Sequence, residues 1–178
     1  MSGFWRVMLC SLLVMATMSM KAEAQVRLRK ADKVVVVKRG RVVKRVPSKT
    51  VVVAHRGTAY RFANGVFYRP KGKRFVVIAP PVGIRVRSLP AARVRVCVGR
   101  SAFFYFNGTF YRKLNASQGY EVVQPPLGAQ VPELPEGTEL VILNGEKYYE
   151  LDGYYYQEFI TNNNQLMYEV VSIAESAD

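Results

Sequence analysis

One histidine and one cysteine are the first residues whose chemistry could serve catalysis. His55 is the only histidine of the 178-residue chain, and Cys97 is the only cysteine beyond the apolar N-terminal run. A cysteine beside a histidine can act as a nucleophile, but no orienting third group or nucleophile motif accompanies these two. A single histidine and a single thiol also cannot supply a structural metal site. We therefore predict no catalytic residue, metal or cofactor here, and expect Cys97 to be a strand thiol, with an intermolecular disulfide as the alternative.

Acidic residues near the C-terminal end are the next candidates for catalysis. Two carboxylates can hydrolyse a glycan by acid–base chemistry, and Glu146, Glu150 and Asp152 lie close together in the sequence. Nothing distinguishes them from an ordinary solvated acidic edge, and Asp152 opens an Asp-Gly turn. An envelope hydrolase is therefore the third of the functions considered, and we predict that the protein is not an enzyme.

Four arginines alternate with branched apolar residues and could bind an anion. Alternation in a strand places such residues on one face; they are Arg85, Arg87, Arg93 and Arg95. They belong to a basic half, since residues 25–100 hold 21 Lys and Arg against Asp32 alone, a net charge of +20, whereas residues 101–178 sum to −8. A surface of this kind attracts polyanions. The alternative is that the basic half binds the acidic third unit, within one molecule or between copies.

The N-terminus resembles a secretory signal peptide. Arg6 precedes an apolar run over residues 7–20, and Ala22-Glu23-Ala24 offers a small-x-small cleavage site. About 14 apolar residues fall short of the roughly 20 that span a bilayer, so a retained membrane anchor is the less favoured alternative. We predict a signal helix over residues 1–24 and export to the periplasm, the outer envelope or the medium. The expected partner is then an anionic envelope polymer or a lipid surface, and not nucleic acid.

The elements that position these residues are predicted to be strands of a threefold repeat. Tyrosine, phenylalanine and valine favour strands, and a dipeptide ending in proline precedes a turn pair by 18 residues three times over. The dipeptides are Val46-Pro47, Leu89-Pro90 and Leu134-Pro135, and the turn pairs are Asn64-Gly65, Asn107-Gly108 and Asp152-Gly153. Such pairs favour two-residue type I′ hairpins.

The repeat predicts an all-β protein built from three related antiparallel units of about 45 residues, stacked or as small barrels. The predicted segments are a basic arm over 25–45 that could form a hairpin, units over 46–88 and 89–133, a truncated acidic unit over 134–173, and a tail over 174–178.

Type I′ turns also predict which aromatic residues face one another. Phe62 would pair with Phe67 on one face of the first hairpin, and Arg61 with Tyr68 on the other. Both faces of the hairpins are thus rich in aromatic residues, so the second face is either covered by a neighbouring unit or exposed. Exposed tyrosines could stack on a wall sugar or peptide, as in bacterial Src-homology-3-like domains; this alternative would use Tyr68, Tyr111, Tyr149 and Tyr156.

The pattern also resembles a known family. Paired Tyr or Phe residues, an Asn-Gly turn, a strand such as Tyr120-Glu121-Val122-Val123, then Pro-Pro-x-Gly and Leu-Pro resemble a family of small exported bacterial proteins catalogued only as a domain of unknown function. The resemblance covers roughly residues 50–172 and leaves out the basic arm. It implies export and the repeat, and it assigns no functional residue. The leading prediction is a non-enzymatic exported structural or interaction protein that binds an anionic surface polymer or associates with itself.

Overall fold

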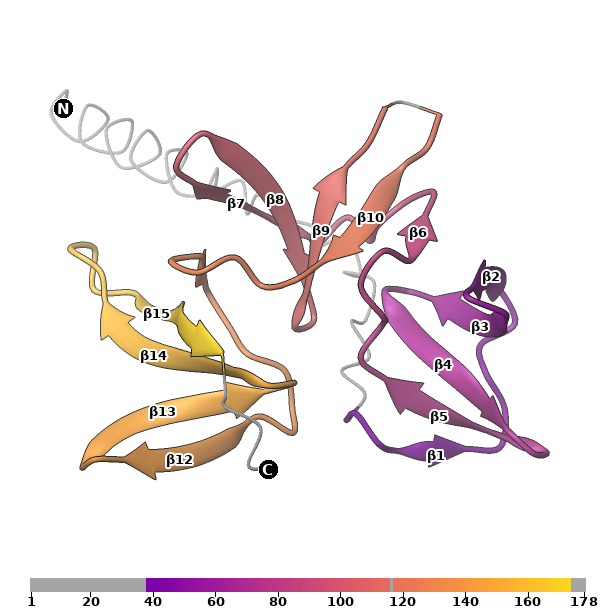
Figure 1. Ribbon diagram of the computed structural model, residues 1–178, viewed down its shortest axis with the longest axis horizontal. Helices are drawn as coiled ribbons and strands as arrows, with labels where there is room; N and C mark the ends of the chain where they lie inside the picture. Colours follow the sequence, from indigo (N-terminus) through magenta and orange to yellow (C-terminus); the bar gives the residue numbers. More distant parts are fainter. Residues whose placement is uncertain (1–37, 116, 174–178) are drawn as a thin grey trace, which may run out of the picture. The chain divides into compact units, whose positions relative to one another are not determined.

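Three separate β-sheets make up the computed structural model, which describes residues 38–115 and 117–173 (Figure 1). Each sheet has five antiparallel strands, and the described residues contain no helix, so none of their elements is a helix able to span a membrane. The all-β prediction is confirmed, and because the sheets do not close on themselves the small-barrel alternative is wrong. The predicted signal helix and the tail over 174–178 lie outside the described residues.

The three sheets have the same strand order. In each one, a two-residue strand pairs with the last strand of a four-stranded meander. The first sheet contains β1 (Val42–Val43), β2 (Val51–His55), β3 (Thr58–Ala63), β4 (Val66–Lys71) and β5 (Arg74–Ile78). The second contains β6 (Arg85–Val86), β7 (Val94–Val98), β8 (Ser101–Phe106), β9 (Thr109–Lys113) and β10 (Tyr120–Val123). The third contains β11 (Gln130–Val131), β12 (Glu139–Leu143), β13 (Glu146–Leu151), β14 (Tyr154–Ile160) and β15 (Leu166–Ile173).

The three predicted hairpin turns form as expected. Both residues of each turn pair have positive φ, with 50° and 79° at Asn64-Gly65, 47° and 75° at Asn107-Gly108, and 52° and 81° at Asp152-Gly153. These are type I′ values, which match the twist of the flanking strands. The predicted partners face each other, namely Phe62 with Phe67 and Arg61 with Tyr68 in the first hairpin, and the equivalent pairs in the other two.

The boundaries between the repeats lie upstream of the predicted ones. β6 falls within the predicted first unit, yet it pairs with β10 of the second sheet. Just before it, Gly83 donates its backbone N–H to the carbonyl of Val122 at 2.9 Å. Gly128 makes the same bond to Val170 at 2.8 Å. Each unit therefore begins at the glycine six residues before its Leu-Pro or Val-Pro dipeptide, and the Pro-Pro pairs separate the units.

This shift corrects two predictions about the ends of the repeat. The third unit is not truncated, because β11 completes its five strands. The basic arm is in part the start of the first unit: Gly40 donates to the carbonyl of Val77 at 2.9 Å, and β1 pairs with β5. The first strand of the hairpin predicted around Arg39-Gly40 falls largely outside the described residues.

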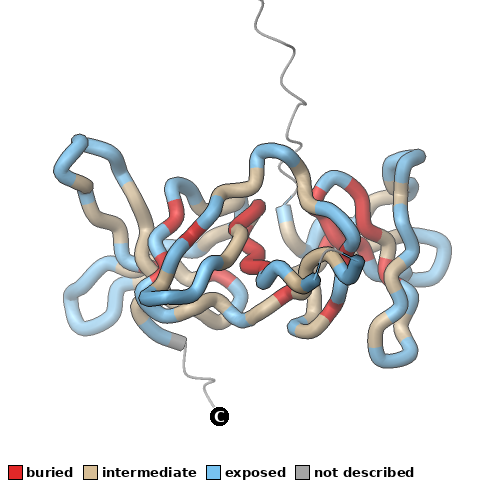
Figure 2. The backbone as a smooth tube through the Cα atoms, turned by 90° about the horizontal axis from the view of Figure 1, so that it is seen from above, coloured by how far each residue is buried: buried red, intermediate tan, exposed pale blue. Residues whose placement is uncertain are grey.

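Neighbouring sheets bury each other's aromatic faces. Figure 2 marks the buried residues in red along the backbone. We call the face with Phe62 and Phe67 face 1, and the face with Tyr68 face 2; equivalent residues define them in the other sheets. Face 1 of the first sheet packs on Ile84, Val86, Phe106, Tyr111 and Val122 of the second sheet. Face 1 of the second sheet, with Val96, Tyr105 and Phe110, packs on Ala129, Val131, Leu151, Tyr156 and Val170 of the third. The units are thus stacked: a neighbouring sheet covers face 2 of the second and third sheets, whereas Tyr68 on face 2 of the first sheet packs with residues of its own unit.

The hairpin turns also pack against the following unit. A Cβ added at Gly65 would lie 2.2 Å from Cε1 of Phe106 and 3.1 Å from Cγ of Pro90. One unit later, a Cβ at Gly108 would lie 3.0 Å from Cδ2 of Leu151 and 2.8 Å from Cγ of Pro135. The repeated Leu-Pro dipeptide therefore places a proline where the turn of the preceding unit packs.

Candidate functional site

The four candidate arginines do not form one face. β6 and β7 follow each other in the sequence, but the strand order puts them at opposite edges of the second sheet, with β8, β9 and β10 between them. Arg87 and Arg95 are exposed, Arg85 is exposed but ion-paired, and Arg93 is half-buried. Strands consecutive in sequence are not neighbours here, so the arginines of β6 and those of β7 lie at different edges of the sheet. Anion binding by these four residues stays a prediction.

Arg85 belongs to a local charge cluster on face 1 of the second sheet. Its Nε lies 3.0 Å from Oε1 of Glu121, and Nη2 of Arg112 lies 2.7 Å from Oε2 of the same carboxylate. The hydrogen bonds from Arg112 and then Arg85 lower the pKa of Glu121 below its ordinary value. One carboxylate thus offsets only one of the two guanidinium charges, and both arginine side chains stay more than half exposed.

Arg93 has a structural role. Its guanidinium carbon lies 5.6 Å from the ring centroid of Phe104 and 6.0 Å from that of Tyr120, and these two rings meet edge to face. It also donates to the carbonyl of Pro90 at 3.2 Å. A cation over aromatic rings next to the Leu-Pro segment stabilises the start of β7.

The tyrosine-groove alternative fails on burial. Tyr68 is 5% exposed, while Tyr111 and Tyr156 are fully buried. Burial raises the pKa of Tyr111 and of Tyr156 above its ordinary value. Tyr149 is half-buried, and its hydroxyl donates to Oε2 of Glu158 at 2.6 Å. Three of the four tyrosines are therefore core residues and cannot stack on a sugar or peptide.

The residues considered for catalysis lie apart or have structural partners. His55 and Cys97 are on β2 and β7, the edge strands of two different sheets, and Cys97 is exposed. Glu150 accepts a hydrogen bond from the backbone N–H of Gly153 at 2.7 Å, which supports the turn that Asp152 opens. No group of three or more candidate metal ligands occurs in the part of the chain that the structure describes.

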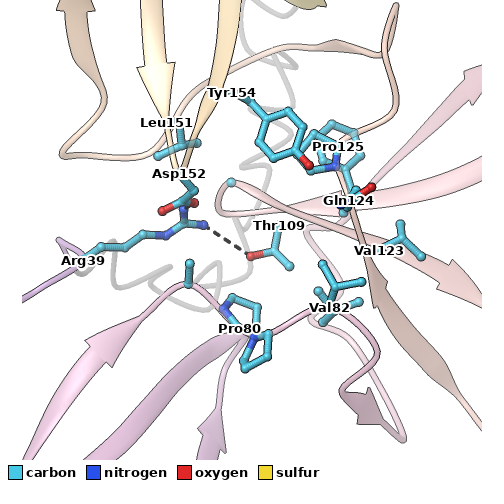
Figure 3. Close-up of a pocket in the computed structure, with 15 residues that line it drawn as sticks. Arg39, Pro80, Val82, Thr109, Val123, Gln124, Pro125, Leu151, Asp152 and Tyr154 are labelled. Carbon is cyan, nitrogen blue, oxygen red and sulfur yellow. Dashed lines mark hydrogen bonds and ion pairs between the residues drawn. The ribbon is translucent and has the colours of Figure 1, made fainter. Parts of the chain in front are cut away.

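Arg39 is a largely buried cation, with 16% of its side chain exposed, that the sequence did not single out as a site residue (Figure 3). It forms an ion pair with Asp152, and its Nη2 lies 3.4 Å both from the carbonyl oxygen of Asn107 and from Oγ1 of Thr109. Desolvation lowers the pKa of this arginine. Arg39 lines a cavity of about 290 Å³ to which all three units contribute, so one side chain connects the start of the first unit with the hairpin turns of the other two.

The sequence did contain a signal for Arg39. Gly40 precedes Val46-Pro47 by six residues, as Gly83 precedes Leu89-Pro90. Val82 therefore occupies the position in the second unit that Arg39 occupies in the first. A charged residue where the repeat has an apolar one indicates a specific partner, and here the partner is Asp152.

A second group that the sequence analysis missed is a highly basic hairpin tip, where β4 turns into β5. Its four cationic residues are Arg69, Lys71, Lys73 and Arg74, all exposed; we call this group the basic hairpin. Lys71 lies directly opposite Arg74 in the ladder. Like charges in this position destabilise a strand pair, and none of the four forms an ion pair within the described residues.

The fold does not require this charge. The positions of Lys71, Lys73 and Arg74 have uncharged counterparts in the tips of the other two sheets, residues 114–119 and 161–165, whereas Arg69 corresponds to Arg112 of the second sheet. Residues 38–115 as a whole hold 19 Lys and Arg and no Asp or Glu. The run Arg69-Pro70-Lys71-Gly72-Lys73-Arg74 is the kind of short basic segment that binds polyanions, and this is the signal that could have identified it.

The comparisons with known proteins assign no activity. No curated protein and no solved structure matches the chain. Residues 34–174 match a family of unknown function, DUF6515. The match begins inside the basic arm, so the expectation that the arm lies outside the family pattern is wrong, in agreement with the pairing of β1 with β5. The chain belongs to the family of unknown function DUF6515.

Proposed function

We propose that this protein is a non-enzymatic binding protein that attaches to an anionic polymer of the cell envelope through the basic hairpin. The observation that carries the proposal is the group of four exposed, unpaired cations at one hairpin tip, with Lys71 opposite Arg74. Lys71 opposite Arg74 costs folding stability at two positions that are uncharged in the other two units, which is what a binding site selected for its charge would do. The choice of an envelope polymer rests on the predicted signal segment over residues 1–24.

The remaining basic residues support this role by long-range attraction. Most of the 19 cations between Lys38 and Asn115 are exposed, and they raise the local concentration of a polyanion before contact. The basic hairpin then supplies a dense contact on a strand pair that projects past its own sheet: β3 pairs with β4 only as far as Tyr68.

Binding to immobilised lipopolysaccharide tests the proposal. The variant replaces all four residues of the basic hairpin by Gln, and a matched control replaces four dispersed exposed cations by Gln, namely Lys44, Lys49, Arg95 and Arg100. Both lose the same net charge. Each cation near an anionic surface contributes about 1 kcal/mol, so the hairpin variant is expected to bind up to about a thousandfold more weakly, and the control much less so.

Salt and competitor arms complete the test. Wild-type binding should weaken as salt rises, because exposed charges are screened. Vesicles of anionic phospholipid and duplex DNA serve as competitors that separate a lipid surface or nucleic acid from the polymer. Equal losses for the two variants, salt-insensitive binding, or no binding by the wild type would each contradict the proposal.

A further inference from the structure

Each sheet has an edge strand after its proline dipeptide, and two of these three edges lack protection. The strands are β2, β7 and β12, each paired on one side only among the described residues. An unpaired edge can add a strand from another chain, and proteins commonly block it with a charged side chain. In β7 that residue is the exposed Arg95; the equivalent positions are Val52 in β2 and Leu140 in β12.

The two unprotected edges expose an unusual amount of apolar surface. Val51 and Val52 of β2 are 58% and 52% exposed, and Leu140 and Ile142 of β12 are 57% and 61% exposed. β2 and β12 both have five residues and no proline. Exposed, regular and apolar edges of this length favour pairing with another strand.

The charges beside the two edges differ in sign. Lys49 and Arg56 flank β2, whereas Glu139 begins β12 and Glu146 of β13 lies opposite Leu143, the last residue of β12. All four are exposed. Two copies of β2 side by side would bring cations together, and two copies of β12 would bring carboxylates together. Only the combination of β2 with β12 is attractive at both ends, so the charges select a heterologous pair.

Symmetry also restricts how the two strands can meet. Because β2 and β12 are equivalent edges of equivalent sheets, antiparallel pairing keeps face 1 beside face 1. Odd-numbered residues of β2 then lie opposite odd-numbered residues of β12. A register with Val53 opposite Val141 aligns both strands in full and places His55 opposite Glu139.

We propose that β2 of one molecule pairs antiparallel with β12 of a second copy of this chain. Each copy keeps one free β2 and one free β12, so the contact is head to tail and generates an open series of oligomers unless it closes into a ring. This association is independent of the anion binding proposed above, because it uses neither Arg69 nor the other cations of the basic hairpin.

Two substitutions at exposed edge positions test the proposal by sedimentation velocity. Val52→Lys blocks β2, and Leu140→Lys blocks β12, by introducing the type of residue that protects β7. The wild-type protein should form species larger than a dimer as its concentration rises, while each variant alone stays monomeric. A mixture of the two retains one free β12 and one free β2, and should form a single heterodimer and nothing larger. Arg95→Lys on β7 is the matched control and should assemble like the wild type.

Charge reversal provides a second test that does not depend on the apolar residues. Lys49→Glu with Arg56→Glu, or Glu139→Lys with Glu146→Lys, should each abolish assembly. Mixing the two double variants should restore the open series, with the two variants alternating, because both β2–β12 combinations between them join opposite charges. A wild-type protein that stays monomeric, a dimer of Leu140→Lys alone, a mixture of the two lysine variants without a heterodimer, or a charge-reversal mixture that stays monomeric would overturn the proposal. If the edge variants still bind lipopolysaccharide, assembly and polymer binding use different parts of the protein.

Discussion

The packing of hairpin turns on neighbouring units predicts a difference between two chemically identical substitutions. Gly65→Ala and Gly153→Ala place the same methyl group at the second position of the same type I′ turn, with φ of 79° and 81°. Left-handed backbone costs alanine about 1 kcal/mol at both sites. At Gly65 the new Cβ would also lie 2.2 Å from Cε1 and 2.4 Å from Cδ1 of Phe106, whereas at Gly153 it meets no described atom within 4 Å.

The neighbours of Gly65 cannot easily move away. Phe106 is only 6% exposed and belongs to the cluster that joins the first two sheets, and Pro90 closes another side of the site. Overpacking of this kind costs about 1–3 kcal/mol. We therefore expect Gly65→Ala to destabilise the protein by about 2–4 kcal/mol and Gly153→Ala by about 1 kcal/mol.

Equilibrium urea unfolding at neutral pH measures both values. Linear extrapolation gives the free energy of unfolding, provided that fluorescence and circular dichroism report coincident transitions. Gly108→Ala should resemble Gly65→Ala, because its Cβ would lie 2.8 Å from Nη2 of Arg39 and 2.8 Å from Cγ of Pro135. If Gly65→Ala and Gly153→Ala differ by less than about 0.5 kcal/mol, an amount within the error of such extrapolations, the turns do not pack against the following unit.

Three further predictions concern the ion pair of Arg39, the carboxylate of Glu121 and the buried tyrosines. Arg39→Met leaves Asp152 without its cation and should lower the free energy of unfolding by about 1–3 kcal/mol. A double-mutant cycle with Asp152→Asn should show a coupling energy of at least about 0.5 kcal/mol. If the two substitutions have additive effects, the ion pair does not contribute to stability. The pKa of Glu121 in the folded state is lowered mainly by Arg112. Its ionised carboxylate therefore stabilises the fold above the ordinary pKa of about 4.3, and this stabilisation is lost as pH falls through the lower pKa of the folded state. Glu121→Gln should make the free energy of unfolding less dependent on pH in this acidic range. Tyrosines whose pKa is raised by burial contribute fully to the free energy of unfolding below about pH 10. Above that pH, each such tyrosine should lower the free energy of unfolding by up to about 1.4 kcal/mol per pH unit. A free energy of unfolding that does not change with pH in alkaline urea titrations would contradict their burial. These tyrosines are Tyr105, Tyr111 and Tyr156.

The hairpins were predictable because their signals are local. An Asn-Gly or Asp-Gly pair determines the turn, and the turn determines that Phe62 faces Phe67 across the strands. The alternation of arginine with apolar residues likewise indicated strands, and β6 and β7 occur there. The sequence left the aromatic second face either covered by a neighbour or exposed, and the structure buries Tyr111 and Tyr156 between sheets.

The boundaries of the units and the arginine surface were not predictable in this way, since both depend on contacts far apart in the sequence. β6 has two residues, too few for a pattern, and its partner β10 begins at Tyr120, more than 30 residues later. The alternation of Arg85 with Val86 correctly indicates a strand but not the edge on which the strand lies. Arg39 was missed for the same reason, because its partner Asp152 is far away in the sequence, in the third unit.

The stacking order changes how the charge gradient should be interpreted. Face 1 of the first and second sheets presents Phe62 and Tyr105 to the next sheet, whereas the third sheet has the half-buried Glu150 at this position. No described residue beyond the third sheet covers that face. Terminal repeats commonly have a polar outer face, because an exposed aromatic surface would favour aggregation. The acidic character of the third unit therefore has a structural reason in part, whereas nothing in the fold requires Lys71 opposite Arg74. Of the two ends of the gradient, the basic one is the better indicator of function.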